Sequence, residues 1–242
     1  MSPDGVSGEP RMKSQEEPRV DNRRSRSQAT QRALMRAAEK LIAEKGIENV
    51  SIRDIVNAAG QKNESALQYH FTNFQGLIRA LHASRDAEIR AKRTAHLERL
   101  RQKTSHPSLR EICKLMVEPE FELARSHPDF RRYVRAFGHE ITLTDKSALA
   151  MVSRKSGQSL LQTGGLLREA FAHLDETAFQ RRLDGALRFI SAAMVHHARQ
   201  KNAFRGVEAA LFFSSLIDAL AGLLSAPESD ETQSIARSLN RA

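Results

Sequence analysis

The fold of this protein is decided by residues 51–73, which read SIRDIVNAAGQKNESALQYHFTN. Ser51 with Asp54 three residues later is typical of a helix N-cap supported by an acid, and Ile55 begins the apolar face of the short helix that follows. Gly60 then permits a tight turn. Two short helices joined through a glycine turn, after a longer supporting helix over residues 28–45, predict a helix-turn-helix.

The second helix of this pair carries hydrogen-bonding side chains, and Asn63 suits its N-cap. The side chains with the length to reach base edges in a major groove are Glu64, Ser65 and Gln68. The side chains with donors that suit phosphate are Lys62, Tyr69 and His70. A polar helix face that is merely solvated is the alternative interpretation.

The distribution of charge argues against that alternative. The chain has 242 residues and a formal net charge of +9. Residues 22–103 hold 17 basic and 8 acidic side chains, so this segment alone carries a net charge of +9. An excess of cations confined to one segment indicates that one module meets a polyanion while the remainder does something else.

The rest of the chain is expected to be helical as well, because no alternating strand pattern of useful length is present. A long helix over residues 73–103, with few apolar residues, is predicted to be a surface connector. Further helices are expected at 108–126, 128–138, 144–172, 175–200 and 206–225. We predict four parts: a disordered tail at 1–27, a three-helix DNA-binding domain at 28–75, a larger helical domain at 76–226 and a polar tail at 227–242.

Residues 34–81 resemble the DNA-binding domain of the TetR family of bacterial repressors. The resemblance rests on three pieces in order: AEKLIAEKG at residues 38–46, SIRDIVNAAG at 51–60, and YHF at 69–71 followed by the NFQGLI start of a helix. Three departures accompany it, because the stretch from Gly60 to Phe71 is one residue longer than the common spacing, Gln68 replaces a frequent Tyr and Phe74 replaces a frequent Lys.

The resemblance implies an all-α fold and a role for each matching residue. Ser51 and Arg53 match positions that contact the DNA backbone or a neighbouring base, and Thr72 and Asn73 match the closing phosphate contacts. The exposed recognition positions would be Asn63, Glu64, Ser65 and Gln68. Tyr69 and His70 match residues that buttress the recognition helix and hold phosphate. Arg23, Arg24 and Arg26 precede the first helix, where a basic arm could reach a groove or the DNA backbone, and a disordered solubilising tail is the alternative interpretation.

The larger domain is expected to bind an effector and to dimerise. Apolar residues repeat at three and four along 179–194, and residues 206–226 are apolar nearly all round, so the helices at about 175–200 and 206–225 are predicted to form a homodimer interface. The family precedent is release of DNA by a small molecule. The candidate effector residues favour an apolar ligand, although each is more often a core residue, and they are Leu115, Met116, Phe121, Phe130, Phe137 and Met151.

Enzyme functions find no support, because no HExxH motif, Gly-rich phosphate loop or nucleophile elbow is present. We expect no cofactor and no metal site, and we assign the single cysteine, Cys113, to the core. Residues 206–226 approach the length of a membrane span, but Glu208 and Asp218 argue against spanning. A cytoplasmic DNA-binding repressor is the favoured function. The alternative is an all-helical interaction protein that binds acidic partners or an anionic membrane.

Overall fold

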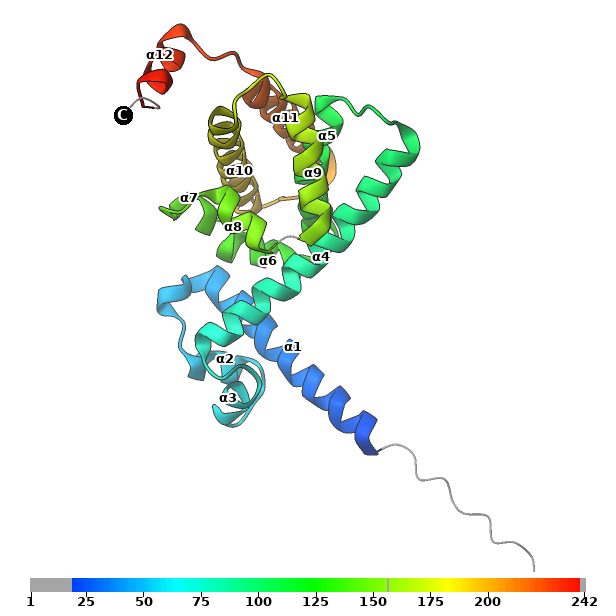
Figure 1. Ribbon diagram of the computed structural model, residues 1–242. Coiled ribbons are helices and arrows are strands. Elements are labelled where there is room, and N and C mark those ends of the chain that lie inside the picture. The colour runs from blue at the N-terminus through cyan, green and yellow to red at the C-terminus, as the bar shows by residue number, and fades with distance from the viewer. Residues whose placement is uncertain (1–18, 156, 240–242) are drawn as a thin grey trace, which may run out of the picture.

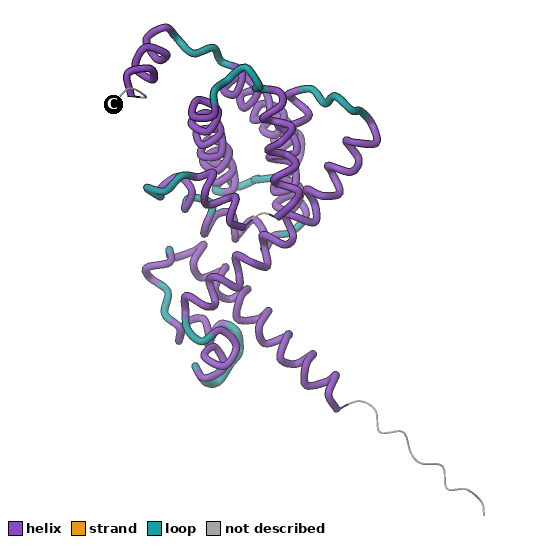
Figure 2. The backbone as a smooth tube through the Cα atoms, viewed as in Figure 1, coloured by secondary structure: helices purple, strands orange, loops and turns teal. Residues whose placement is uncertain are grey.

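The computed structural model describes the backbone of residues 19–155 and 157–239, and the side chains of 24–152 and 157–239. All regular structure in these ranges is helical, which confirms the predicted all-α class (Figures 1 and 2). The helices of the first half are α1 (Arg19–Lys45), α2 (Ile52–Ala58), α3 (Ser65–Phe71), α4 (Phe74–Lys103), α5 (Leu109–Ser126) and α6 (Pro128–Phe137), with a short 3-10 turn at Ile47–Asn49. Those of the second half are α7 (Glu140–Leu143), α8 (Ala148–Lys155), α9 (Gly157–Ala170), α10 (Glu176–Ala198), α11 (Gly206–Ser225) and α12 (Asp230–Leu239).

A small core joins α1, α2, α3 and the first turns of α4. Its innermost side chains are almost entirely removed from solvent, which stabilises each leucine or isoleucine by about 1.5–3 kcal/mol relative to exposure. They are Leu34, Ala38, Ile55, Leu67, Leu77 and Leu81. Phe137 of α6 closes the same cluster from the side of the larger domain. Helices α1, α2 and α3 are therefore anchored to the rest of the molecule through α6 as well as α4.

Helix α1 begins earlier than the sequence indicated. The predicted disordered tail at 1–27 is wrong for residues 19–27, which form the first turns of α1, whereas residues 1–18 lie outside the described residues. Extending an existing helix adds one hydrogen bond per residue and needs no new nucleus, and arginine is a good helix former. We call α1, α2, α3 and the first turns of α4 the small domain. The exposed Arg24 and Arg26 thus lie on a helix that extends beyond it (Figure 1).

The larger domain is built around α5, α10 and α11, with α4 and α9 packed against α5. Helix α4 is not the surface connector that its thin apolar content suggested. It buries Leu77 and Leu81 in the small core, and it buries Arg93, His96 and Leu97 farther along. A single helix of 30 residues therefore belongs to both cores.

Two other predictions about helices need correction. The helix expected over 144–172 is divided into α8 and α9, because Gly157 has φ of +59°, a left-handed conformation that interrupts a right-handed helix. The polar tail at 227–242 contains α12, which leaves Ile235 and Leu239 exposed.

Helix α11 is, among the described helices, the one with the length and apolar composition to cross a membrane. It buries Leu216, Ile217 and Leu220 in the core of the larger domain, where it contacts α5 and α10. Glu208 and Asp218 lie on its exposed side. Its packing accounts for part of its apolar surface, and a further face remains exposed.

Candidate DNA interface and effector cavity

The start of α2 is fixed by a reciprocal capping box. The backbone N–H of Asp54 donates to Ser51 Oγ at 3.1 Å, and the backbone N–H of Ser51 donates to Asp54 Oδ2 at 3.0 Å. The Ser51 hydroxyl also donates to Asp54 Oδ2 at 2.6 Å, and this bond, together with the one from the Ser51 backbone N–H, lowers the pKa of Asp54. Two otherwise unpaired donors at the helix N-terminus are satisfied in this way, and Ser51 and Arg53 are both exposed at the same end of the helix.

The turn between α2 and α3 depends on a left-handed residue. Gly60 has φ of +70°, which a side chain would disfavour. Asn63 lies one residue before the position assigned as the N-cap, Glu64, yet its Oδ1 accepts a hydrogen bond from the backbone N–H of Ser65 at 3.0 Å. Asn63 therefore organises the start of α3, as its residue type indicated, and is occupied by that bond.

Helix α3 divides sharply into a buried and an exposed face. Leu67 and Phe71, four residues apart, are buried in the small core. Tyr69 follows Leu67 by two residues, so it points about 200° away, and its side chain is 78% exposed. The expectation that Tyr69 buttresses the helix is therefore wrong. The other exposed side chains along this segment are Lys62, Asn63, Glu64, Ser65 and Gln68.

His70 supplies the contact between helices that Tyr69 does not. Its Nδ1 lies 3.5 Å from Nε2 of Gln31 on α1, and its ring is half-buried. The ring of Tyr69 meets that of His70 edge-on at 4.9 Å. His70 thus links α3 to the supporting helix while Tyr69 stands at the surface.

The end of α3 passes directly into the cap of α4. Thr72 has φ of +69°, and Oδ1 of Asn73 accepts a hydrogen bond from the backbone N–H of Gly76 at 2.8 Å. A Cβ on Gly76 would lie 1.8 Å from the carbonyl oxygen of Phe71, so only glycine fits there. Thr72 and Asn73 are exposed beside the C-terminus of α3.

The candidate contact residues are exposed on α2, in the turn, on α3 and at the start of α4, except for the half-buried His70. The exposed cations are Arg53 and Lys62 in this part of the chain, and Arg24, Arg26, Arg32 and Arg36 on α1. Side chains of this kind can bind phosphates while Glu64, Ser65 and Gln68 have the groups that distinguish bases.

A cavity of about 170 Å³ lies in the larger domain between α4, α5, α6, α7, α8, α9 and α10. Three of the six expected effector residues, Met116, Phe137 and Met151, line it. The other three do not. Phe121 packs against Phe204 and Phe213, Phe130 is fully buried, and Leu115 lies on the opposite side of α5.

The walls of the cavity are more polar than the sequence indicated. Their charged residues are Asp86, Arg90 and Arg93 of α4, Glu120 of α5 and Glu140 of α7. The residues chosen from the sequence favoured an apolar ligand, and the wall of the cavity adds five charged side chains to them. Sequence inspection missed these residues, although a signal was present: Arg93 falls four residues from both Ile89 and Leu97, and Glu120 falls four from Met116, so each charge interrupts an apolar stripe.

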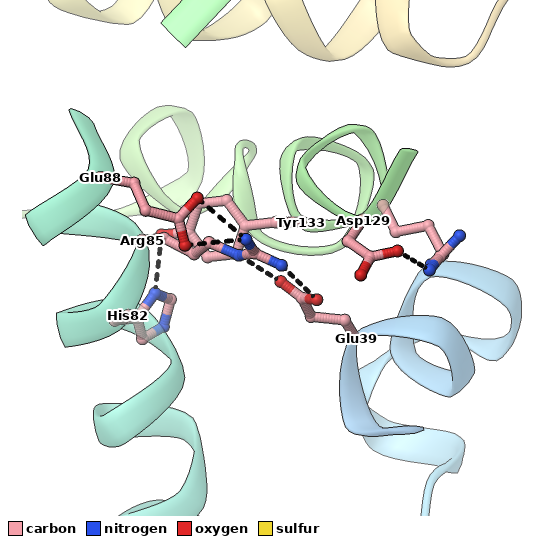
Figure 3. A network of polar contacts seen from close by, with 7 residues as sticks. Glu39, His82, Arg85, Glu88, Asp129 and Tyr133 are labelled. Carbon is pink, nitrogen blue, oxygen red and sulfur yellow. Dashed lines mark hydrogen bonds and ion pairs between the residues drawn. The ribbon is translucent and has the colours of Figure 1, made fainter. Parts of the chain in front are cut away.

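A polar network joins α4 to α1 and to α6, the helix from which Tyr133 reaches the cavity (Figure 3). Arg85 of α4 donates to Glu39 of α1 through Nε and Nη2, both at 2.7 Å, and to Glu88 through Nη1. Burial raises the pKa of Glu39, and the bonds from Arg85 oppose that shift. Tyr133, which lines the cavity, has its hydroxyl 3.0 Å from Nδ1 of His82 on α4.

One cluster among the described residues has the donors for a metal ion. His96, Glu118 and Glu122 place one ligand atom each within 4.8 Å of one another. Lys92 already donates to Glu122 at 3.2 Å, and Arg99 contacts His96 at 2.9 Å. The two cations occupy the groups that a metal would need, so the geometry favours an ion-pair cluster.

Comparisons with known proteins gave a family match for the N-terminal part of the chain and structural matches over most of it. Residues 34–81 match the family described as bacterial regulatory proteins, tetR family, which confirms the resemblance. A TetR family transcription regulator from Marinobacter aquaeolei VT8 has 16% identity and a TM-score of 0.53, over 81% of this chain and 97% of its own. A protein described as a TetR-family transcriptional regulator from Rhodococcus sp. has 17% identity and a TM-score of 0.53, over 79% and 98%. No curated protein matches the chain significantly.

Proposed function

Residues 34–81 of this chain form a DNA-binding domain of the tetR family of bacterial regulatory proteins, and from this premise we propose that the protein is a dimeric repressor that a small molecule releases from a palindromic operator. The observation that carries the proposal is the polar face of α3. Leu67 and Phe71 bury one side of the helix, so Glu64, Ser65 and Gln68 stand outward where a major groove would receive them.

The surroundings of α3 fit a phosphate backbone on either side. Ser51 and Arg53 lie at the start of α2, Lys62 lies in the turn, and Thr72 and Asn73 lie at the far end of α3. Contacts from such residues set the position of a protein on DNA and carry no base preference. Base preference would then come from Glu64, Ser65 and Gln68, with Tyr69 added as an exposed ring that can contact a sugar or base.

Dimerisation through α10 and α11 is supported by the face that each helix leaves exposed. On α11, Val207 is 85% and Leu211 is 66% exposed, and Gly222 continues the same side, on which Asp218 pairs with Arg110 of α5. Gly185 on α10 is also exposed. Large apolar side chains beside small residues permit close packing of a second pair of helices. A two-fold dimer would place two α3 helices on half-sites about 34 Å apart.

Ligand response is supported by the elements that the cavity shares with the small domain. Tyr133 and Phe137 of α6 line the cavity, and Phe137 also belongs to the core around α1. His82 of α4 contacts Tyr133, and Arg85 one turn later holds Glu39 of α1. A ligand that moved α6 or α4 would therefore displace α1 and change the distance between the two reading helices.

The deciding experiment is selection of bound sequences from random DNA, followed by footprinting on the selected site. We expect a palindrome whose affinity falls steeply with salt concentration, since several phosphates would be neutralised. Absence of a selected site, or binding that salt does not weaken, would refute DNA recognition. Binding to anionic vesicles without DNA binding would favour the alternative of an interaction protein at a membrane.

The dimer has its own test. Leu211→Glu should shift the protein to monomer in sedimentation and abolish footprinting of the full palindrome. Leu161→Glu is the matched control, because Leu161 is 71% exposed on α9, away from α10 and α11. Equal behaviour of the two variants would contradict an interface at α11. We also expect the protein to act in the cytoplasm, where the operator DNA lies.

A further inference from the structure

The wall of the cavity contains a buried cation, whose Nε has no hydrogen-bond partner among the described residues. Arg93 of α4 is 8% exposed, and its Nε has no acceptor. No ion pair joins it to another described residue, although Glu120 and Asp86 lie close enough to affect its charge. A guanidinium removed from water normally pairs with an acceptor, because an uncompensated charge in a protein interior costs several kcal/mol.

The other charged groups that face the cavity leave Arg93 available. Asp86, Arg90 and Glu140 have interactions of their own, and the hydroxyl of Tyr133 contacts His82. Glu120 of α5 remains, and burial raises its pKa to about 7 while Arg93 opposes that shift. Near neutral pH a substantial share of Glu120 is therefore protonated. A protonated carboxyl does not neutralise the charge of Arg93, and its O–H can donate a hydrogen bond. The walls contributed by α9 and α10 carry Leu160, Leu187, Ile190, Ser191 and Met194, which do not titrate.

The rest of the wall is apolar and of a size that admits one ring. Ile89, Met116, Val134, Phe137 and Met194 line it, and the volume is about 170 Å³. An engineered apolar cavity of about 150 Å³ in another protein holds benzene. The cavity can therefore hold the apolar part of a small ligand, and its wall contains the guanidinium of Arg93, which has no ion-pair partner among the described residues.

We propose that the effector is a small organic acid, whose apolar body fills this cavity and whose carboxylate pairs with Arg93 and accepts a hydrogen bond from Glu120. The assignment rests on the proposed ligand-responsive function and specifies the chemistry of its effector. Arginine suits the role because its planar donors match a carboxylate, and such charge-assisted bonds are roughly twice as strong as neutral ones.

Proton uptake accompanies this binding. A ligand carboxylate beside Glu120 favours the protonated form of Glu120, so binding draws a proton onto it. With a pKa of about 7 in the free protein, Glu120 is already mostly protonated at pH 6 and mostly ionised at pH 8. The affinity for a carboxylate should therefore be about tenfold weaker at pH 8 than at pH 6.

The test is calorimetric titration of the full chain with phenylacetate and with its neutral analogue phenylacetamide, at both pH values. We expect phenylacetate to bind more tightly than the amide at pH 6 and to lose about tenfold by pH 8. Arg93→Met should weaken phenylacetate by about tenfold or more and leave the amide unchanged. Glu120→Gln, whose amide N–H replaces the O–H donor of the protonated carboxyl, should retain the affinity seen at pH 6 and remove the pH dependence.

The controls separate this assignment from folding and from the proposed function. Arg101→Met removes the same charge from an exposed position of α4 and should leave both ligands unaffected. Equal binding of acid and amide, no binding of the acid, or an unchanged affinity in Arg93→Met overturns the assignment. DNA binding is measured on the same preparations without ligand: a selected DNA site with no preference for the acid would overturn only the effector chemistry. Acid binding through Arg93 without any DNA site would support the cavity assignment and refute the repressor.

Discussion

Arg85 of α4 holds both carboxylate oxygens of Glu39 of α1 at 2.7 Å, and Glu39 is 1% exposed. The same guanidinium lies over the ring of Phe130 on α6 at 5.7 Å. One side chain therefore joins the first helix of the DNA-binding domain to two helices of the larger domain. The helix-turn-helix part of the molecule and the larger domain are therefore linked through a buried ion pair in addition to apolar packing.

The first prediction concerns this pair. Arg85→Ala leaves the buried Glu39 carboxylate without a partner, so we expect a loss of about 3–5 kcal/mol in the free energy of unfolding, measured with urea. The double variant Glu39→Leu with Arg85→Leu should lose less, since it leaves no buried charge. Arg79→Ala is the control, because Arg79 is exposed on α4. A double variant as unstable as Arg85→Ala would show that the pair contributes through packing alone.

The second prediction separates base contacts from phosphate contacts. Gln68→Ala should cost about 1–3 kcal/mol on the preferred sequence and relax the preference at one base pair of each half-site. Lys62→Ala should weaken binding to all sequences alike and reduce the salt slope by about 1. Binding curves on the selected site and its single-base variants measure both. Identical effects of the two variants on every sequence would contradict this division.

The third prediction concerns the close approach of α4 to the end of α3. Gly76→Ala places a Cβ 1.8 Å from the carbonyl oxygen of Phe71, so backbone must move and the melting temperature should fall. Gly164→Ala is the matched control, since nothing lies within 4 Å of a Cβ there. In the interior of α9 that change should stabilise the protein by about 0.5–1 kcal/mol. Equal effects of both substitutions would disprove the steric argument.

The fourth prediction is a pH dependence of stability that Glu120 causes. Its pKa is about 7 in the folded chain and near 4.5 without burial, so the folded state holds one more proton between these values. The free energy of unfolding should therefore fall as pH rises from 4.5 to 7, by about 3 kcal/mol at most, and change no further from this group above pH 7. Urea titrations of the parent and Glu120→Gln should converge at pH 4 and diverge by pH 8. Parallel pH profiles would contradict a buried, titrating Glu120.

The fifth prediction concerns the single cysteine. Cys113 is fully buried, and burial raises its pKa to about 12. The thiol therefore stays protonated at pH 8, and since the thiolate is the nucleophile, iodoacetamide should label it only after unfolding. Mass spectrometry of native and denatured samples gives the comparison. Rapid labelling of the native protein would contradict its place in the core.

The DNA-binding domain could be predicted because each of its signals acts over a few residues. The capping box joins positions 51 and 54, the turn needs a glycine at 60, and Leu67 and Phe71 bury one face because they stand four apart. The family resemblance predicts that Tyr69 buttresses the recognition helix, whereas its position two residues after Leu67 directs its side chain outward. Local geometry was sufficient there, and it was the better guide.

By itself, therefore, the sequence determined the helical class, the helix-turn-helix and the excess of charge in residues 22–103, since caps, turns and helical spacing depend on neighbours within about four positions. Only the tertiary structure decided that Arg93 of α4 and Glu120 of α5 line one cavity and that Arg85 reaches Glu39 across 46 positions of the chain. Such pairs arise from how whole helices pack, and packing is set by many side chains at once. A charge that interrupts an apolar stripe shows that a partner is needed, and only the fold shows which partner it is.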